Sequence, residues 1–420
     1  MKRSYLAITI LGYALFSGFD SIKAENTEAV TSLDSCIAIA MRNNLNVKAS
    51  ALQQQKAKDM ESTYFEIEPT EISLSQDPTG GGGPENSITV SQTFSMPSVY
   101  TSRRKQLKAQ TQVERQKHRI AGKELAMEVT SAYYSVLKQR DVCKLLQEQD
   151  SVYSNFLKIA DVRYRNGESG ALERMNAQKA LEENGILLSN AQKEYGNSVA
   201  ALQSLVGTSR PILPQETKLN AIDGSSALLS FNAESTAADS LSVLEKRVGE
   251  REVSCAKKAY LPTVSIALRG QALIKGFNPY NVERERFAKG NFMGFEVGIG
   301  LPLSFSAIRG KVKAAQREVE LADVNRERQK ANLQLAHKQL LSSFATAQQA
   351  IQYYEQTGIP QAQEMERLSQ VSYANGEINY IELTQNLKEA ISVKLDYLEA
   401  IDDYNQIVIK LNYLTGKSNN

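Results

Sequence analysis

The side chains that most often carry chemistry are few in this sequence and stand far apart. The three cysteines, Cys36, Cys143 and Cys255, are odd in number, which rules out a fully paired set of disulfides within the chain. The two histidines, His118 and His337, lie near no cysteine and far from each other. A transition metal usually needs three or four such ligands together. The sequence therefore predicts no metal site and no cofactor, and it predicts that the cysteines are small buried helix residues.

The sequence also lacks the residue patterns that usually indicate an enzyme active site. No nucleophile stands beside a base, and no glycine-rich phosphate loop precedes a helix. The 49 Lys and Arg residues against 47 Asp and Glu leave a formal net charge of +2, and the charges are interspersed along the chain. Nothing therefore indicates a nucleic-acid partner. We expect a protein that is not an enzyme.

What the sequence does contain is a long internal repeat. Residues 162–207 and 371–416 align without a gap, and both segments begin Val-x-Tyr-x-Asn-Gly-Glu and close Leu-x-Gly. The matched pairs include two acids, two tyrosines and two Asn-Gly-Glu runs: Tyr164 with Tyr373, Asn166 with Asn375, Gly167 with Gly376, Glu168 with Glu377, and Glu173 with Glu382. A unit of roughly 200 residues is too long for a solenoid repeat. It indicates a duplicated half-molecule, whose function must be sought in what two halves build together.

The first residues have the pattern of a secretory signal. Met1-Lys2-Arg3 precedes an apolar stretch, and the small residues around Ala24 suit cleavage there, so residues 1–24 are interpreted as a signal peptide. The alternative is a retained anchor, but the apolar run is shorter than a bilayer span requires. No cysteine stands at the cleavage site, so we expect no lipid anchor there.

The rest of the chain divides into two similar halves. Each half reads as a helix, two short strands, a very long helix, a tight turn and a returning helix. The predicted divisions are a first repeat at 25–207, a linker at 208–235, a second repeat at 236–416 and a tail at 417–420. The strands are predicted at about 69–78 and 86–97 in the first half, and at about 262–274 and 291–303 in the second.

The four predicted strands alternate between aliphatic and small or polar residues, for example Ile72 and Leu74 with Ser73 and Ser75. This period of two gives each strand one apolar and one water-compatible face. Joined by polar or glycine-rich loops such as 80–84 and 275–291, such strands are a weak signature of an outer-membrane barrel. Four strands cannot close a barrel alone, so several chains would have to share one. The alternative is a half-buried meander in a soluble protein.

The helices that follow the strands favour the barrel. Residues 98–164 and 306–373 contain almost no helix breakers, and each stretch would span on the order of 100 Å, which is longer than a globular core. Apolar residues recur every seven positions, which predicts a coiled-coil seam; the rows are Val129, Val136 and Cys143, or Leu145, Val152 and Ile159. Pro360 predicts a local kink or a change of packing. Gly167 and Gly376 predict sharp reversals into returning helices at 172–207 and 381–416.

These features together resemble the TolC-type outer-membrane efflux family across about residues 33–416. Particularly similar are the segments 33–44 (Leu-Asp-x-x-Ile-Ala-x-Ala-x-x-Asn-Asn), 91–104 with Pro97 and Arg103-Arg104, and 299–310 with Leu-Pro-Leu. Residues 94–104 look most like members that work with heavy-metal or drug pumps of the resistance-nodulation-division type. The resemblance implies a mainly α fold with a small antiparallel β part. In a homotrimer, twelve strands would form one transmembrane β-barrel and the helical hairpins would continue it as an α-barrel.

The resemblance also implies a location, partners and site residues. The chain would lie in the outer membrane with a periplasmic extension, contact membrane lipid, and work with a periplasmic adaptor and an inner-membrane pump. An acidic ring that narrows the closed channel falls on Glu382, with Glu173 as its repeat partner and Gln385 where some relatives carry a second acid. The alternative is that these are solvated helix residues. The hairpin tips are candidates for adaptor docking, although turn chemistry alone explains Asn-Gly: Arg163, Tyr164, Asn166, Gly167 and Glu168 in the first tip, and Tyr373, Asn375, Gly376 and Glu377 in the second.

Two other functional classes compete with this conduit. An enzyme has no supporting residues, as described above. A secreted coiled-coil scaffold would share the long helices, but it would not need four alternating strands in register with the repeat. Detergent extraction distinguishes the two remaining classes, because a membrane conduit should require detergent and a scaffold should not.

Overall fold

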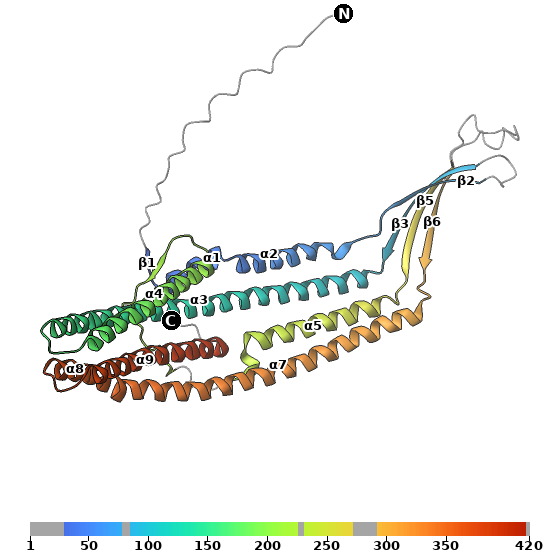
Figure 1. Cartoon of the computed structure of the whole chain (residues 1–420). Coiled ribbons are helices and arrows are strands. Elements are labelled where there is room, and N and C mark those ends of the chain that lie inside the picture. Colours follow the sequence, from blue (N-terminus) through green and yellow to red (C-terminus); the bar gives the residue numbers. More distant parts are fainter. Residues whose placement is uncertain (1–28, 78–84, 226–230, 272–291, 417–420) are drawn as a thin grey trace, which may run out of the picture.

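The computed structural model describes residues 29–77, 85–225, 231–271 and 292–416 of the chain, and these parts form one elongated body (Figure 1). A small sheet lies at one end, two helical hairpin turns lie at the other, and short elements gather at a waist between them. The predicted signal peptide 1–24, the loops 80–84 and 275–291 and the tail 417–420 lie outside the described residues.

The sheet contains four strands in the order β2-β3-β5-β6, all antiparallel: β2 (Glu71–Asp77), β3 (Glu85–Ser95), β5 (Thr263–Gln271) and β6 (Phe292–Gly300). The register puts Ile72, Val90, Leu268 and Phe295 in one row across the four strands. Because side chains alternate between faces, all the aliphatic rows share one face and the neighbouring row of Ser73, Thr89, Arg269 and Gly294 points the other way.

The aliphatic face of this sheet is uncovered in the described chain. Its exposed side chains are Ile72, Leu74, Ile88, Val90, Ile266, Leu268, Met293, Phe295, Val297 and Ile299. A contiguous apolar surface of this kind marks a contact with lipid or with another chain. The half-buried meander considered from the sequence would instead have packed this face against a core.

Two long helices leave the sheet and run the length of the body. Helix α3 (Pro97–Arg165) follows β3 directly, and its 69 residues span on the order of 100 Å. It returns as α4 (Ala171–Val206). In the second half α7 (Phe305–Tyr353) and α8 (Ile359–Ala374) together take the place of α3, and α9 (Tyr380–Thr415) returns. Among the described residues, no helix combines the length and apolar character of a membrane span.

The interruption between α7 and α8 is a π-helical turn, η4 (Tyr354–Gly358), which ends two residues before Pro360. Proline cannot donate the regular backbone hydrogen bond and its ring crowds the preceding turn, so a widened turn relieves the clash. The change of packing predicted at Pro360 is therefore a π turn within a nearly continuous rod.

Of the two rows predicted for the seam of α3, the row of Val129, Val136 and Cys143 is buried as predicted. The second predicted row lies one residue away from the buried one. Leu145, Val152 and Ile159 are only half-buried, whereas Leu146, Tyr153 and Ala160 are buried. Both rows have the heptad spacing. Helix α3 packs against α4 and also against α9 of the other hairpin, and this second partner rotates the buried face away from a simple two-helix seam.

Shorter helices lie beside the long helices on the side of the waist nearer the sheet. The single helix expected near residues 33–64 is divided into α1 (Leu33–Asn43), α2 (Leu45–Met60) and a 3-10 turn η1 (Glu61–Phe65), because Asn44 leaves helical geometry and its side chain caps α2. In the second half a 3-10 turn η3 (Ala233–Ser235) precedes α5 (Ala237–Lys258), which is capped by Thr236. Helix α2 lies along α3, and α5 lies between α3 and α7.

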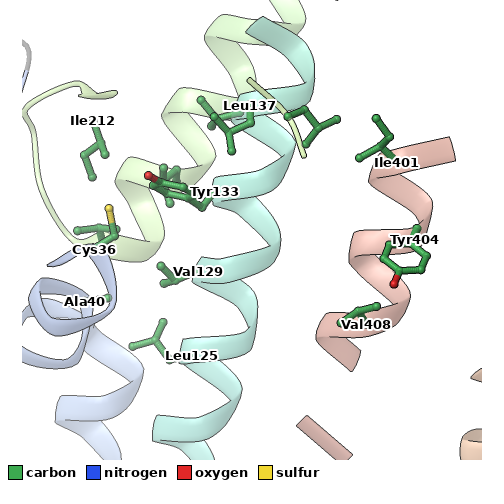
Figure 2. Close-up of a cluster of buried hydrophobic side chains, with 14 of the residues drawn as sticks. Cys36, Ala40, Leu125, Val129, Tyr133, Leu137, Ile212, Ile401, Tyr404 and Val408 are labelled. Carbon is green, nitrogen blue, oxygen red and sulfur yellow. The ribbon is translucent and has the colours of Figure 1, made fainter. Parts of the chain in front are cut away.

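The waist holds the largest hydrophobic core. Figure 2 shows Leu125, Val129, Tyr133 and Leu137 along one stretch of α3, with Cys36 and Ala40 of α1 on one side and α9 on the other. Two short strands missed from the sequence, β1 (Ala29–Thr31) and β4 (Ile212–Pro214), pair in parallel beside this core. Three-residue strands are too short to show a periodic pattern, which is why sequence reasoning does not find them.

The linker between the halves is tied to both of them. On the first half, Leu219 N donates to Asp141 Oδ2 at 2.7 Å and Lys144 Nζ donates to Thr217 O at 3.1 Å. On the second half, fully buried Asn405 accepts from Ile222 N at 2.8 Å and donates to Asn220 O at 2.9 Å. These contacts make the linker a strap across the waist. The predicted fold class, mainly helical with a four-stranded antiparallel sheet and two repeats, is confirmed.

Candidate functional site at the hairpin tips

The two hairpin tips have the same backbone geometry, as their shared sequence predicts. Gly167 and Gly376 adopt left-handed conformations with φ of +76° and +77°. In the first tip, Glu168 N donates to Arg163 O at 2.9 Å, and in the second Glu377 N donates to Ser372 O at 2.8 Å. These bonds satisfy the last carbonyls of each helix, and glycine tolerates the positive φ that they require. Turn chemistry therefore accounts for the Asn-Gly pair in both tips.

One residue of the second tip connects the two hairpins. Tyr373 of α8 is 2% exposed, and its hydroxyl donates a hydrogen bond to the carboxylate of Glu173 on α4. Arg163 of α3 completes the group: its Nε lies 3.8 Å from Glu173 Oε1, and its guanidinium lies 5.2 Å from the centre of the Tyr373 ring. We call Arg163, Glu173 and Tyr373 the inter-hairpin link.

Hydrophobic packing surrounds the link and excludes water from it. The ring of Phe156 meets Tyr373 edge to face, with centroids 5.2 Å apart. Small or aliphatic side chains from three helices complete this cluster: Ala160 of α3, Ala177 and Ala180 of α4, and Leu383 and Leu387 of α9. Burial and the hydrogen bond to Glu173 raise the pKa of the Tyr373 phenol well above its usual range. The hydroxyl therefore keeps its proton at neutral pH and remains a donor.

The repeat partners of the link residues have opposite surroundings. Glu173 is 8% exposed, whereas Glu382 is exposed and caps α9. Asn379 N donates to Glu382 Oε2 at 3.4 Å, and Glu382 N donates to Asn379 Oδ1 at 3.0 Å. Gln385, one turn along the same helix, is also exposed. Tyr164 is 41% exposed and carries the Arg174 guanidinium 5.8 Å from its ring centre.

The structure therefore divides the candidate residues into two groups. Arg163, Glu173 and Tyr373 come together inside the chain, so their side chains face the other hairpin rather than the end of the molecule. The remaining tip residues, and the acid and amide of α9, lie on the surface: Tyr164, Asn166, Gly167, Glu168, Asn375, Gly376, Glu377, Glu382 and Gln385. Sequence reasoning missed Phe156 and the pairing of Tyr373 with Glu173, because the repeat gives both acids and both tyrosines equal weight.

The described parts of the chain contain no arrangement of side chains suited to metal binding or to disulfide chemistry. Within those ranges no group of three or more His, Cys, Asp or Glu side chains is placed to hold a metal ion. The three cysteines are free, with Cys36 and Cys143 buried and Cys255 half-buried. Burial raises the pKa of the Cys36 thiol to about 11, so this thiol is neutral and unreactive at physiological pH.

Comparisons with known proteins agree on one family. The sequence profile of the family "Outer membrane efflux protein" matches residues 72–208 and 243–417. No curated protein sequence shows significant similarity to the chain. Among solved structures, the chain is similar to CusC, with a TM-score of 0.75, 15% identity and coverage of 93% of both chains.

Two further channels have the same fold. The Campylobacter jejuni CmeC outer membrane channel gives a TM-score of 0.70 at 15% identity, covering 98% of this chain and 94% of that one. The open state of the Neisseria gonorrhoeae MtrE channel gives 0.70 at 14% identity, covering 96% and 94%. At these identities the likeness establishes the fold, and the family profile establishes the membership.

Family membership decides among the functions considered from the sequence. Channels of this family are trimeric partners of efflux pumps, and they are transporters rather than enzymes. They place a sheet in the bacterial outer membrane and a helical domain in the periplasm, as the uncovered aliphatic face and the long rods require. The chain belongs to the outer membrane efflux protein family, and it is the outer-membrane channel of a tripartite, TolC-type efflux system.

Proposed function

We propose that three copies of this chain close one twelve-stranded barrel and one helical tube, which form a passive conduit for substrates delivered by an inner-membrane pump and a periplasmic adaptor. The observation that carries this proposal is made on the described residues: an aliphatic sheet face is uncovered, and the outer edges of β2 and β6 are open. Unpaired backbone groups at such edges are not tolerated in hydrocarbon. Only pairing with further copies satisfies them.

The strand directions fit that closure. Successive strands in the order β2-β3-β5-β6 are antiparallel, so β6 runs opposite to β2. When β6 of one copy meets β2 of the next, the new pair is also antiparallel, and the ring closes without a change of pattern. The same pairing would place every aliphatic row on the outside and the small polar rows around the lumen.

Oligomeric state and conductance test this assembly. The protein extracted in detergent should have the mass of three chains by light scattering, should resist dodecyl sulfate until heated, and should form ion-conducting pores in planar bilayers. A monomer that remains in solution without detergent would refute the assembly.

The gate is assigned to Glu382. This carboxylate is exposed near the second tip, and three copies arranged around an axis would bring three like charges together. Such charges repel one another and attract cations, which favours cation selectivity and a gate that opens when they are separated. Glu382→Gln keeps the capping acceptor and removes the charge, and Glu389→Gln removes an exposed charge from the same helix. Loss of cation selectivity and of multivalent-cation block is expected only for Glu382→Gln, and equal behaviour of the two variants would remove Glu382 from the gate.

Adaptor docking is assigned to the surface residues of both tips. Glycine at 376 has positive φ with no atom within 4 Å of an added Cβ, so a large side chain there projects into the space where a partner would lie. Gly376→Ala imposes the same backbone strain without the bulk. We expect Gly376→Trp to abolish pump-dependent resistance and Gly376→Ala to preserve most of it, at equal protein levels. Resistance that survives in Gly376→Trp would exclude the tip from docking.

A further inference from the structure

The repeat defines a second pair of residues equivalent to the Tyr373–Glu173 pair of the inter-hairpin link, and the members of this second pair do not meet within the described chain. Within the chain, Tyr373 of the second hairpin binds Glu173 of the first. The equivalent positions in the alignment are Tyr164 on the first hairpin and Glu382 on the second. Both side chains are exposed in the described chain, on opposite hairpins, and each lies at the same place in its helix as its buried partner.

The two halves match closely enough for this equivalence to be structural. Helices α4 and α9 each contain 36 residues and begin at matched positions, Ala171 and Tyr380. Both end at a left-handed glycine, Gly207 or Gly416. The turns before them have the same φ and the same hydrogen bonds, as described above. A contact between the two hairpins of one chain therefore has an equivalent between the second hairpin of that chain and the first hairpin of the next.

We propose that Tyr164 donates a hydrogen bond to Glu382 of the partner subunit, repeating between copies the contact that Tyr373 makes with Glu173 within the chain. This inference rests on the proposed trimer. In a ring of six hairpins, three contacts between neighbouring hairpins, which we call seams, lie within chains and carry the Tyr373–Glu173 pair. Three further seams lie between chains, and they gain the Tyr164–Glu382 pair when the second hairpin moves toward the partner subunit.

The two kinds of seam differ in the residues around the pair. Within the chain, Phe156, Ala177, Ala180, Leu383 and Leu387 pack around Tyr373. Their repeat equivalents are polar or more flexible: Met365, Asn386, Glu389, Arg174 and Gln178. The link residue Arg163 is replaced by Ser372. Less apolar area is buried between copies, so the seam between copies is the weaker one and separates first.

The proposed contact also gives the Glu382 carboxylate two alternative positions, which it cannot occupy at the same time. When the six hairpins are evenly spaced, its carboxylate accepts from Tyr164 of the partner subunit at the wall of the tube. When the second hairpins move inward, the carboxylate leaves that hydroxyl and joins the proposed ring at the axis. Tyr164 therefore stabilises the open arrangement, whereas Tyr373, bonded to Glu173, opposes the movement of the second hairpin away from its own first hairpin and stabilises the closed one.

Site-directed cross-linking tests the contact. A Tyr–Glu pair holds its Cβ atoms further apart than a disulfide allows, so Tyr164→Cys and Glu382→Cys are joined with a short, reducible bifunctional thiol reagent in a Cys255→Ser background. Both positions are exposed, so the variant should fold. Covalent trimers are expected, together with a raised conductance that a reducing agent reverses. The control pair, Tyr164→Cys with Lys388→Cys, places the second thiol on the side of α9 that faces Glu183 of its own chain, and it should give no covalent trimer.

The outcomes separate this inference from the assembly on which it rests. If the untreated protein is trimeric but the 164–382 pair gives no more covalent trimer than the 164–388 pair, the contact is refuted and the assembly stands. If the untreated protein is not trimeric, both fail. Tyr164→Phe provides a test without cysteines: its open fraction should fall about threefold through loss of one hydrogen bond per seam, and an unchanged open fraction would overturn the assignment.

Discussion

Removing a single hydroxyl from the inter-hairpin link should shift the channel toward its open state. In Tyr373→Phe the ring keeps its edge-to-face contact with Phe156 and its position beneath the Arg163 guanidinium, so the packing is preserved. What is lost is the hydrogen bond to Glu173. The substitution therefore isolates one polar interaction at the point where the hairpins meet.

The magnitude follows from the burial of both partners. Glu173 has a side chain that is 11% exposed, so water does not readily replace the lost donor. A hydrogen bond to a buried charged group contributes about 2 kcal/mol. Arg163 remains 3.8 Å from the carboxylate and keeps its charge compensated, so we do not expect the larger loss of an isolated buried charge. About 2 kcal/mol corresponds to roughly a 30-fold change in the equilibrium between linked and separated hairpins.

Single-channel recording in planar bilayers measures this equilibrium directly. The open fraction of Tyr373→Phe should rise by an order of magnitude or more while the conductance of the open pore stays the same. Tyr353→Phe is the matched control, because that tyrosine is exposed on α7 and losing its hydroxyl should change nothing. An open fraction within twofold of the wild type for Tyr373→Phe, with normal trimer yield, would refute the reasoning.

The pH dependence of the link provides a second reading of the same interaction. The phenol pKa of Tyr373 is raised in the folded chain by burial first and by the bond to Glu173 second. A raised folded pKa means that the link is fully present below the ordinary phenol pKa of about 10 and is lost as the pH rises above it. Wild-type channels should therefore gain open fraction only in strongly alkaline solution, and Tyr373→Phe should lack this response.

Two predictions concern the waist. Asn405→Ala removes the two hydrogen bonds that hold Ile222 N and Asn220 O of the linker, and it leaves these backbone groups unpaired in a buried site. The free energy of unfolding should fall by about 2–4 kcal/mol. Asn332→Ala changes an exposed residue and is the control; equal thermal midpoints for the two variants would contradict the prediction. His337 stacks on Phe231 with ring centroids 4.3 Å apart, and burial lowers its pKa. Because the folded pKa lies below the unfolded one, this stack stabilises the fold above about pH 6.5 and loses that contribution as the pH falls. The midpoint of the wild type should drop more than that of His337→Phe between pH 7 and pH 5, and parallel curves would rule out His337 as the titrating group.

Local sequence patterns predicted the elements of this protein well, for reasons that act within a few residues. Strict alternation in β5 and β6 is a property of neighbouring side chains, and so is the glycine that reverses the chain at Gly167 and Gly376. The absence of breakers over α3 left no other element compatible with that segment. Helix boundaries and interruptions are harder to predict from sequence. The predicted helix at 33–64 is divided at Asn44, for example, only because that residue leaves helical geometry and caps the next helix.

The candidate site shows where local patterns stop being informative. From the sequence, Tyr164 and Tyr373 are interchangeable, and so are Glu173 and Glu382. Their burial is set by the side of each hairpin that meets the other, and this depends on how two segments some 200 residues apart pack. The same long-range packing buries Tyr153 rather than Val152 near the tip of α3, whereas Val129, Val136 and Cys143 are buried as predicted.

The sequence by itself thus determined the duplicated design, the sheet at one end and the rods that follow it, because periodicity and turn chemistry are written in adjacent residues. Tertiary structure decided which member of each repeated pair is buried and which is left for another copy. Within the described residues the two hairpins of a chain meet along one side of each, and at the tips this side carries the buried Tyr373–Glu173 pair. The identical residues on the outer sides remain exposed until the ring is closed.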